Sequence, residues 1–147
     1  MAPKAATFSN RISYVTLGVD NLQRAVSFYR DGLGLATKGI IGNEIDNGAV
    51  AFFDFQPGLK LALWPRKSIS AECNVPLGAV DASGFMLAHN VANTAAVDAI
   101  MQQALDAGAT VVRPAKKFGW GGYGGVFQDL DGHLWEVVWN PHDGSTG

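Results

Sequence analysis

The sequence predicts an α+β fold built from two copies of one βαβββ module. Three observations predict it. Short runs in which apolar and polar residues alternate indicate half-buried strands, two apolar stripes at helical spacing indicate amphipathic helices, and the same order of elements occurs twice. Because 147 residues are too few for two ordinary domains, the modules should share one core within a single domain spanning residues 1–147.

The first module is expected at residues 11–65. It opens with an alternating strand and continues with a helix that Asp20 or Asn21 can cap and that should end near Gly32. Three strand-like runs follow, separated by turn-forming Gly, Asn and Pro residues. The expected strands are 12–19, 36–41, 49–55 and 59–64.

The same order recurs in the second module, which is expected at residues 84–141. Asn93 or Thr94 can cap its helix, and Gly108 should end it. The second module has more residues between its first strand and its closing glycine than the first module has, so its helix should be one turn longer. The linker is expected at 66–83, where small and turn-forming residues are frequent. The expected strands are 85–91, 110–114, 123–128 and 133–139.

The face of each sheet that is not covered by its helix needs another cover. We expect that cover to be a ligand, the other module, or both. The alternative is a ferredoxin-like or other α+β sandwich that has no cleft.

Composition and charge exclude several classes of protein. Hydrophobic residues make up 48% and charged residues 16%, which is typical of a globular domain with a large core. A net charge of -2 and the lack of a long Lys or Arg run argue against nucleic acid as a partner. Cys73 is the only cysteine, which fits a reducing compartment. Without a signal-like or membrane-length apolar segment, we expect a cytoplasmic protein with no membrane partner and short frayed tails.

Motifs of a known family occur at both ends of the predicted fold, in segments 14–22, 25–29 and 32–35 of the first module and in segment 127–136 of the last hairpin. The first three resemble the opening of modules of the vicinal oxygen chelate superfamily, which includes glyoxalases, bleomycin-resistance proteins and dioxygenases. The fourth resembles the closing hairpin of these modules, with Leu130 where a proline is usual. The resemblance implies curved, mostly antiparallel sheets that form a cleft. Segments that resemble a glyoxalase-like branch, whose members mostly lack an assigned reaction, are 87–91, 120–123 and 135–141.

The resemblance also implies positions for metal ligands on the first and last strands of each module. These positions fall on Tyr14, Met86, Glu136 and either Leu61 or Ala62. Only Glu136 is a usual ligand, and one carboxylate cannot supply the three or four donors of a tight site. We therefore expect no metal and no other cofactor. A metal-dependent glyoxalase or dioxygenase-type enzyme is the alternative.

The histidines are not expected to complete a metal site. His89 alternates with Leu87 on the helix-facing side of its strand, which is typical of a hydrogen-bonded core histidine. His133 follows a hairpin turn and His142 lies near the C-terminus, so both should face solvent.

The candidate site combines a carboxylate with aromatic side chains. Glu136 is the candidate general base, and Tyr14, which the resemblance places on the same cleft floor, is the candidate hydrogen-bond donor. Trp120 and Tyr123 lie in the glycine-rich segment 118–125, where they can form a stacking wall for a ligand. Tyr14 and Glu136 are also expected to contact the ligand, together with Thr16, Met86 and Asn90.

These residues favour the binding of a small organic molecule, aromatic or conjugated, in a metal-free cleft. One alternative is a metal-independent lyase or isomerase in which Glu136 removes a proton beside a carbonyl group. Another is a scaffold that dimerises and binds no ligand. Exposed sheet edges and apolar faces predict a homodimer, and the sequence leaves open whether the modules pair within one chain or between chains.

Overall fold

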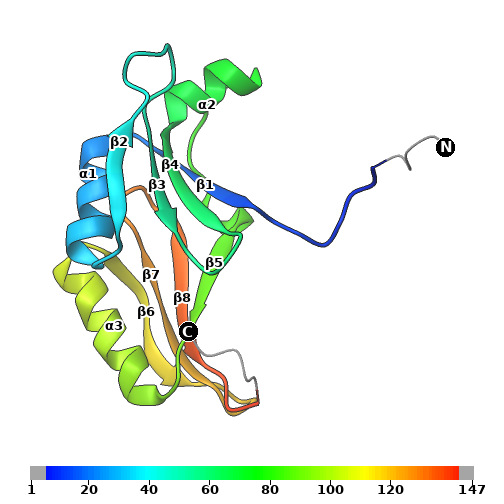
Figure 1. Cartoon of the computed structure of the whole chain (residues 1–147). Coiled ribbons are helices and arrows are strands. Elements are labelled where there is room, and N and C mark those ends of the chain that lie inside the picture. The colour runs from blue at the N-terminus through cyan, green and yellow to red at the C-terminus, as the bar shows by residue number, and fades with distance from the viewer. Residues whose placement is uncertain (1–5, 143–147) are drawn as a thin grey trace.

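The computed structural model describes residues 6–142; the outermost residues at both ends, where we expect tails, lie outside that part. The described chain forms two four-stranded sheets (Figure 1), with strand orders β1-β4-β3-β2 and β5-β8-β7-β6. In each sheet the first strand of the module runs parallel to the last, and the other neighbours are antiparallel. The prediction of an α+β fold with two βαβββ modules is confirmed.

The first module begins with β1 (Tyr14–Val19), as its alternating pattern predicts. The side chain of Asn21 accepts a hydrogen bond from the backbone N–H of Arg24, so Asn21 caps α1. The module then contains α1 (Leu22–Ser27), the π-helix η1 (Phe28–Gly32), β2 (Thr37–Ile41), β3 (Val50–Asp54) and β4 (Lys60–Pro65).

The end of the first helix differs from our expectation. Gly34, and not Gly32, takes the left-handed conformation, with φ of 75°. Gly32 instead lies where two helices approach closely, because a Cβ atom at this position would be 2.5 Å from the Cβ of Ala107. Its lack of a side chain therefore serves the packing of the two modules.

The second module repeats the first with a longer helix. The side chain of Asn93 accepts a hydrogen bond from the Ala96 backbone N–H, which caps the helix as expected. This helix has 13 residues, against six in α1 and five in η1, so the second helix is longer as expected, but by less than the full turn that we predicted. The elements are β5 (Met86–Asn90), α3 (Thr94–Asp106), β6 (Thr110–Lys117), β7 (Tyr123–Gln128) and β8 (Leu134–Trp139).

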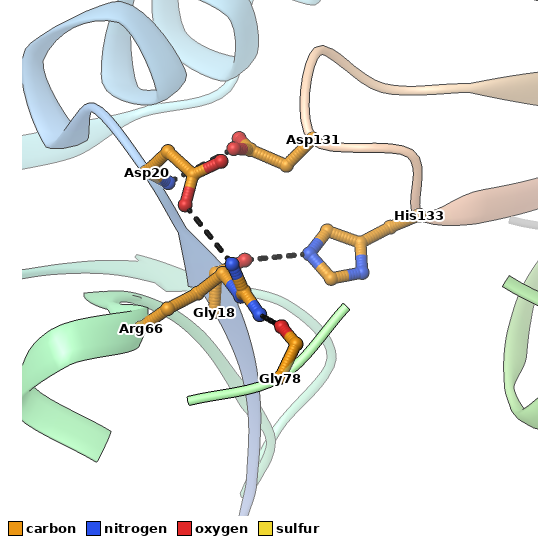
Figure 2. Close-up of polar contacts among 6 residues, drawn as sticks. All are labelled: Gly18, Asp20, Arg66, Gly78, Asp131 and His133. Atoms are coloured by element: carbon orange, nitrogen blue, oxygen red, sulfur yellow. Dashed lines mark hydrogen bonds and ion pairs between the residues drawn. The ribbon is translucent and has the colours of Figure 1, made fainter. Parts of the chain in front are cut away.

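The linker is more ordered than its composition indicates, because it contains α2 (Arg66–Cys73) and the short 3-10 helix η2 (Ala82–Gly84). The prediction missed α2 because its sequence lacks an apolar stripe. The helix packs over β1 at Gly18, where a Cβ atom would be only 2.9 Å from Arg66 Cγ. Arg66 also pairs with Asp20 at 3.3 Å and donates to the Gly78 carbonyl (Figure 2).

One hydrophobic core spans both modules. α1 and α3 lie on the same side of the two sheets (Figure 1), and α3 contacts η1. Fully buried members come from both halves, such as Phe53 and Leu63 in the first sheet and Val97 and Val137 in the second module. The buried cluster therefore includes residues of both modules.

Hydrogen bonds at the β7–β8 turn also join the modules. The backbone N–H of Asp20 donates to Asp131 Oδ1 at 2.9 Å, and His133 Nε2 is 2.8 Å from the Gly18 carbonyl oxygen (Figure 2). His133 is therefore half-buried at the junction, and the expectation that it faces solvent is wrong. His142 is exposed, as expected.

Candidate ligand-binding site

The pairing of strands in the two sheets shows which residue of the first module corresponds to Glu136 of the second. Glu136 pairs with Ala88 in the second sheet, two residues after the first pair of β5 and β8. The matching pair in the first sheet is Thr16 with Ala62. Ala62, and not Leu61, thus has the place in the first module that Glu136 has in the second.

The donor set at these positions does not fit a metal of the kind that the superfamily holds. The four positions carry Tyr14, Ala62, Met86 and Glu136, of which only Glu136 offers a carboxylate. Within residues 6–142, no group of three or more His, Cys, Asp or Glu side chains is placed to hold a metal ion.

The first sheet carries Tyr14 and Thr16, both exposed on the face away from α1. The ring of Tyr14 contacts Phe52 edge to face, with centroids 5.8 Å apart. Beside these rings are two shallow hollows of about 460 and 330 Å³, which share Asp54 and Lys60 in their walls. Asp54 and Lys60 form an exposed ion pair at 3.5 Å, so this face combines aromatic rings with paired charges.

The second sheet carries Met86, Asn90 and Glu136 on the corresponding face, because β5 and β8 are in register. Glu136 is half-buried, and its Oε2 accepts a hydrogen bond at 3.3 Å from the guanidinium of Arg113. The structure therefore supplies a cationic partner that we did not predict. Tyr14 contacts its own sheet and Glu136 contacts Arg113, so these two candidate catalytic groups belong to different sheets.

A row of stacked groups continues from Glu136 towards the β6–β7 turn. Arg113 Cζ is 4.7 Å from the ring centroid of Phe118, which is cation–π geometry. The Phe118 and Trp120 rings stack with centroids 5.4 Å apart and planes at 17°. Gly122 makes room for the indole, because a Cβ atom there would be 2.0 Å from a ring carbon of Trp120. Trp120 remains 51% exposed.

The structure places Tyr123 away from this row. Its neighbour in register is Trp139, and its hydroxyl donates to Asp98 Oδ1 of α3 at 2.5 Å. This hydrogen bond raises the pKa of Tyr123 above its ordinary value. Tyr123 therefore points to the helix side, opposite Glu136, as strict alternation along β7 would have indicated.

Arg113 and Phe118 are the site residues that sequence reasoning missed. The expected strand stopped at Pro114, because proline removes a ladder hydrogen bond. β6 instead continues to Lys117, since it is the edge strand of its sheet and its register shifts between Arg113 and Lys116. This bulged edge brings Arg113 beside Glu136.

His89 lies on the helix side of β5 as expected, but the prediction of a core position is wrong. Its side chain is exposed and borders a cavity that also includes Ile100 and Gln103 of α3. The reason is that β5 is an edge strand, so α3 covers only part of it.

Comparisons with known proteins agree with this fold. The family model of the Glyoxalase/Bleomycin resistance protein/Dioxygenase superfamily matches residues 11–137. The chain therefore belongs to this superfamily. No helix in the described part of the chain is long and apolar enough to cross a membrane.

The solved structures to which this chain is similar include glyoxalase-related proteins. A glyoxalase-related enzyme from Fulvimarina pelagi is 30% identical, with 95% of this chain and 98% of that chain covered and a TM-score of 0.76. A hypothetical protein from S. aureus is 22% identical and has a TM-score of 0.74, and the match covers 91% of this chain and 96% of that chain. Lactoylglutathione lyase from Agrobacterium tumefaciens is 24% identical and has a TM-score of 0.65, and the match covers 92% of this chain and 98% of that chain. The last two show the fold alone. A comparison with curated proteins found no match.

Proposed function

We propose that the chain binds a small organic molecule with a flat aromatic or conjugated part on the open face of the second sheet. The observation that carries this proposal is the row in which Trp120 stacks on Phe118 and Phe118 lies under Arg113. About half of the Trp120 side chain is exposed, so a flat molecule can stack against the ring. Aromatic stacking gives such a site affinity without a metal or another cofactor.

The ion pair next to the row supplies polarity. Arg113 and Glu136 keep 35% and 28% of their side chains accessible, so both can contact a bound molecule. The guanidinium offers several donors in a planar arrangement, and the carboxylate offers acceptors. A ligand that fits this face therefore combines a flat ring with a carbonyl, hydroxyl or carboxylate group near Arg113.

The test begins with a thermal-shift screen of flat aromatic and conjugated compounds, followed by titration of each binder with tryptophan fluorescence. Trp120→Ala should weaken binding about five- to tenfold, because an aromatic pair is worth about 1 kcal/mol. Trp120→Phe should retain most of the affinity. Gly122→Ala should act like Trp120→Ala, because the added methyl group displaces the indole.

Val112→Ala is the matched control, since Val112 lies next to Arg113 on β6, is exposed, and has no part in the stacked row. It should leave affinity unchanged. If Trp120→Ala and Gly122→Ala both bind a screened compound as tightly as the parent, the proposal is wrong.

A second candidate function is a metal-independent lyase or isomerase. The contact between Arg113 and Glu136 favours it, because a guanidinium beside a carboxylate can polarise a carbonyl group while the carboxylate accepts a proton. Tyr14 lies on the other sheet. It would act in the same site only if a ligand bridges the open faces of the two sheets, or if the first sheet of one chain faces the second sheet of another. Glu136→Gln should then retain binding of a screened compound and abolish its turnover, whereas a protein that only binds shows no turnover in either form.

A further inference from the structure

A second concavity lies on the helix side of the sheets, opposite Glu136. It has a volume of about 120 Å³ and lies where the two modules meet, between η1, α3 and the second sheet. This volume is somewhat below the roughly 150 Å³ of an apolar cavity that holds benzene. The space is open on the side of His89 and Gln103, so it can take one small ring whose substituent extends out of the pocket.

The floor of this cavity is apolar and fixed. Tyr29, Phe127, Trp135 and Val137 line it, and each is at most 7% exposed. The polar atoms of the floor are already paired, because Trp135 Nε1 donates to the Tyr29 hydroxyl and that hydroxyl donates to Asp129. The floor consequently presents ring and aliphatic surface and no unpaired donor.

Aromatic rings make up most of this floor, and Phe55 extends it. The Phe127 and Trp135 rings are nearly parallel at 9°, and Phe55 lies at 28° to Trp135, with centroids 6.4 Å apart in both pairs. Leu33 and Leu35 close the side towards the first module. Such walls favour a ring over an open aliphatic chain.

The polar groups of the cavity are at its rim. His89 and Gln103 line the cavity, and both are exposed. The Gln103 side chain reaches back to the Gly32 carbonyl at 3.4 Å, which is a long hydrogen bond that a ligand can replace. A molecule in the cavity would thus meet hydrogen-bonding groups only where it leaves the apolar floor.

We infer that this cavity is a second binding site, for a monocyclic aromatic molecule that carries one hydrogen-bonding substituent. The ring lies on Phe127 and Trp135, and the substituent points to His89 and Gln103. The site is independent of the stacked row at Trp120, because the two lie on opposite faces of the second sheet.

Phenol and toluene are suitable probes, since they share a ring and differ in the hydroxyl group. In ¹H–¹⁵N correlation spectra of the full chain, phenol should give saturable shifts at the amides of Ile100 and Gln103 and at the Trp135 indole N–H. His89→Ala should weaken phenol binding about tenfold and leave toluene binding unchanged, because only phenol uses the rim. Ile100→Phe should fill the cavity and abolish both.

Val112→Ala, a change at an exposed residue outside both sites, is the matched control and should leave phenol binding at the parent level. In Trp120→Ala the phenol shifts at Ile100, Gln103 and the Trp135 indole N–H should persist. The inference is overturned if phenol gives no saturable shifts at these positions, or if His89→Ala, which alters only an exposed side chain, leaves the difference between phenol and toluene unchanged. Loss of the phenol shifts at Ile100, Gln103 and Trp135 in Trp120→Ala would also overturn it, since these shifts would then report binding at the proposed functional face.

Discussion

The hydroxyl of Tyr29 donates a hydrogen bond to Asp129 Oδ2 at 2.5 Å, which ties the helix of the first module to the closing hairpin of the second. The other carboxylate oxygen of Asp129 accepts the backbone N–H groups of Asp131 and His133. One buried side chain thus shapes the β7–β8 turn and also docks the modules. This double role explains in physical terms why the closing hairpin carries an aspartate at this position.

Tyr29→Phe should lower the free energy of unfolding by about 2 kcal/mol, because it removes a donor from a buried carboxylate. The Trp135 indole N–H also loses its acceptor. Chemical denaturation measures the change. Tyr123→Phe is the matched control and should cost less, since the hydroxyl of Tyr123 binds an exposed carboxylate. Equal losses in the two variants would contradict the special role of Tyr29.

The stability of the protein should fall at alkaline pH. Burial, followed by the charge of Asp129, raises the pKa of Tyr29 well above its ordinary value. The folded state therefore keeps this proton after the unfolded state has lost it, so the contribution is complete below about pH 10 and is lost above it. Unfolding curves from pH 9 upward should show a shallower decline for Tyr29→Phe than for the parent. Parallel declines would contradict this prediction.

Gly32→Ala should destabilise the protein by about 1–3 kcal/mol, because the new methyl group overpacks the contact between η1 and α3. The clash is with the Cβ of Ala107. Combining Gly32→Ala with Ala107→Gly should recover part of the loss, whereas Ala107→Gly should not rescue Gly34→Ala, whose strain comes from the backbone. Thermal or chemical unfolding of the four variants tests this, and a neutral Gly32→Ala would contradict the close approach.

The purified protein should contain no stoichiometric divalent metal. Tyr14, Ala62 and Met86 occupy positions where a site of the superfamily type needs donors, and Glu136 already contacts Arg113. Elemental analysis after mild purification measures the content. One equivalent of Zn, Mn, Ni or Fe per chain that survives dialysis and is lost in Glu136→Ala would disprove the metal-free proposal.

The protein should form a homodimer at micromolar concentration. Tyr14, Met86 and Trp120 each leave about half of a large apolar side chain exposed on the sheet faces or at the β6–β7 turn, and such surfaces often mark interfaces. Light scattering should give about twice the chain mass of 15.6 kDa. Met86→Glu should shift the mass towards that of a single chain if the open face of the second sheet takes part. A mass of one chain for the parent would contradict the prediction.

Local patterns in the sequence determined most of the elements, because strand alternation, helical stripes and caps depend on neighbours only a few residues away. Asn21 and Asn93 cap their helices as expected, and the eight strands follow the predicted order. Glu136 became a candidate because the family resemblance places a ligand position there and because its strand neighbours are apolar; its role stays a prediction.

Only the tertiary structure decided which side chains meet. Arg113 reaches Glu136 through a bulge in an edge strand, and Tyr29 meets Asp129 although they are 100 residues apart. α2 forms without an apolar stripe because Gly18 of a distant strand leaves room for it. Register shifts and close approaches between modules depend on packing between segments far apart in the chain, so a single local pattern does not encode them.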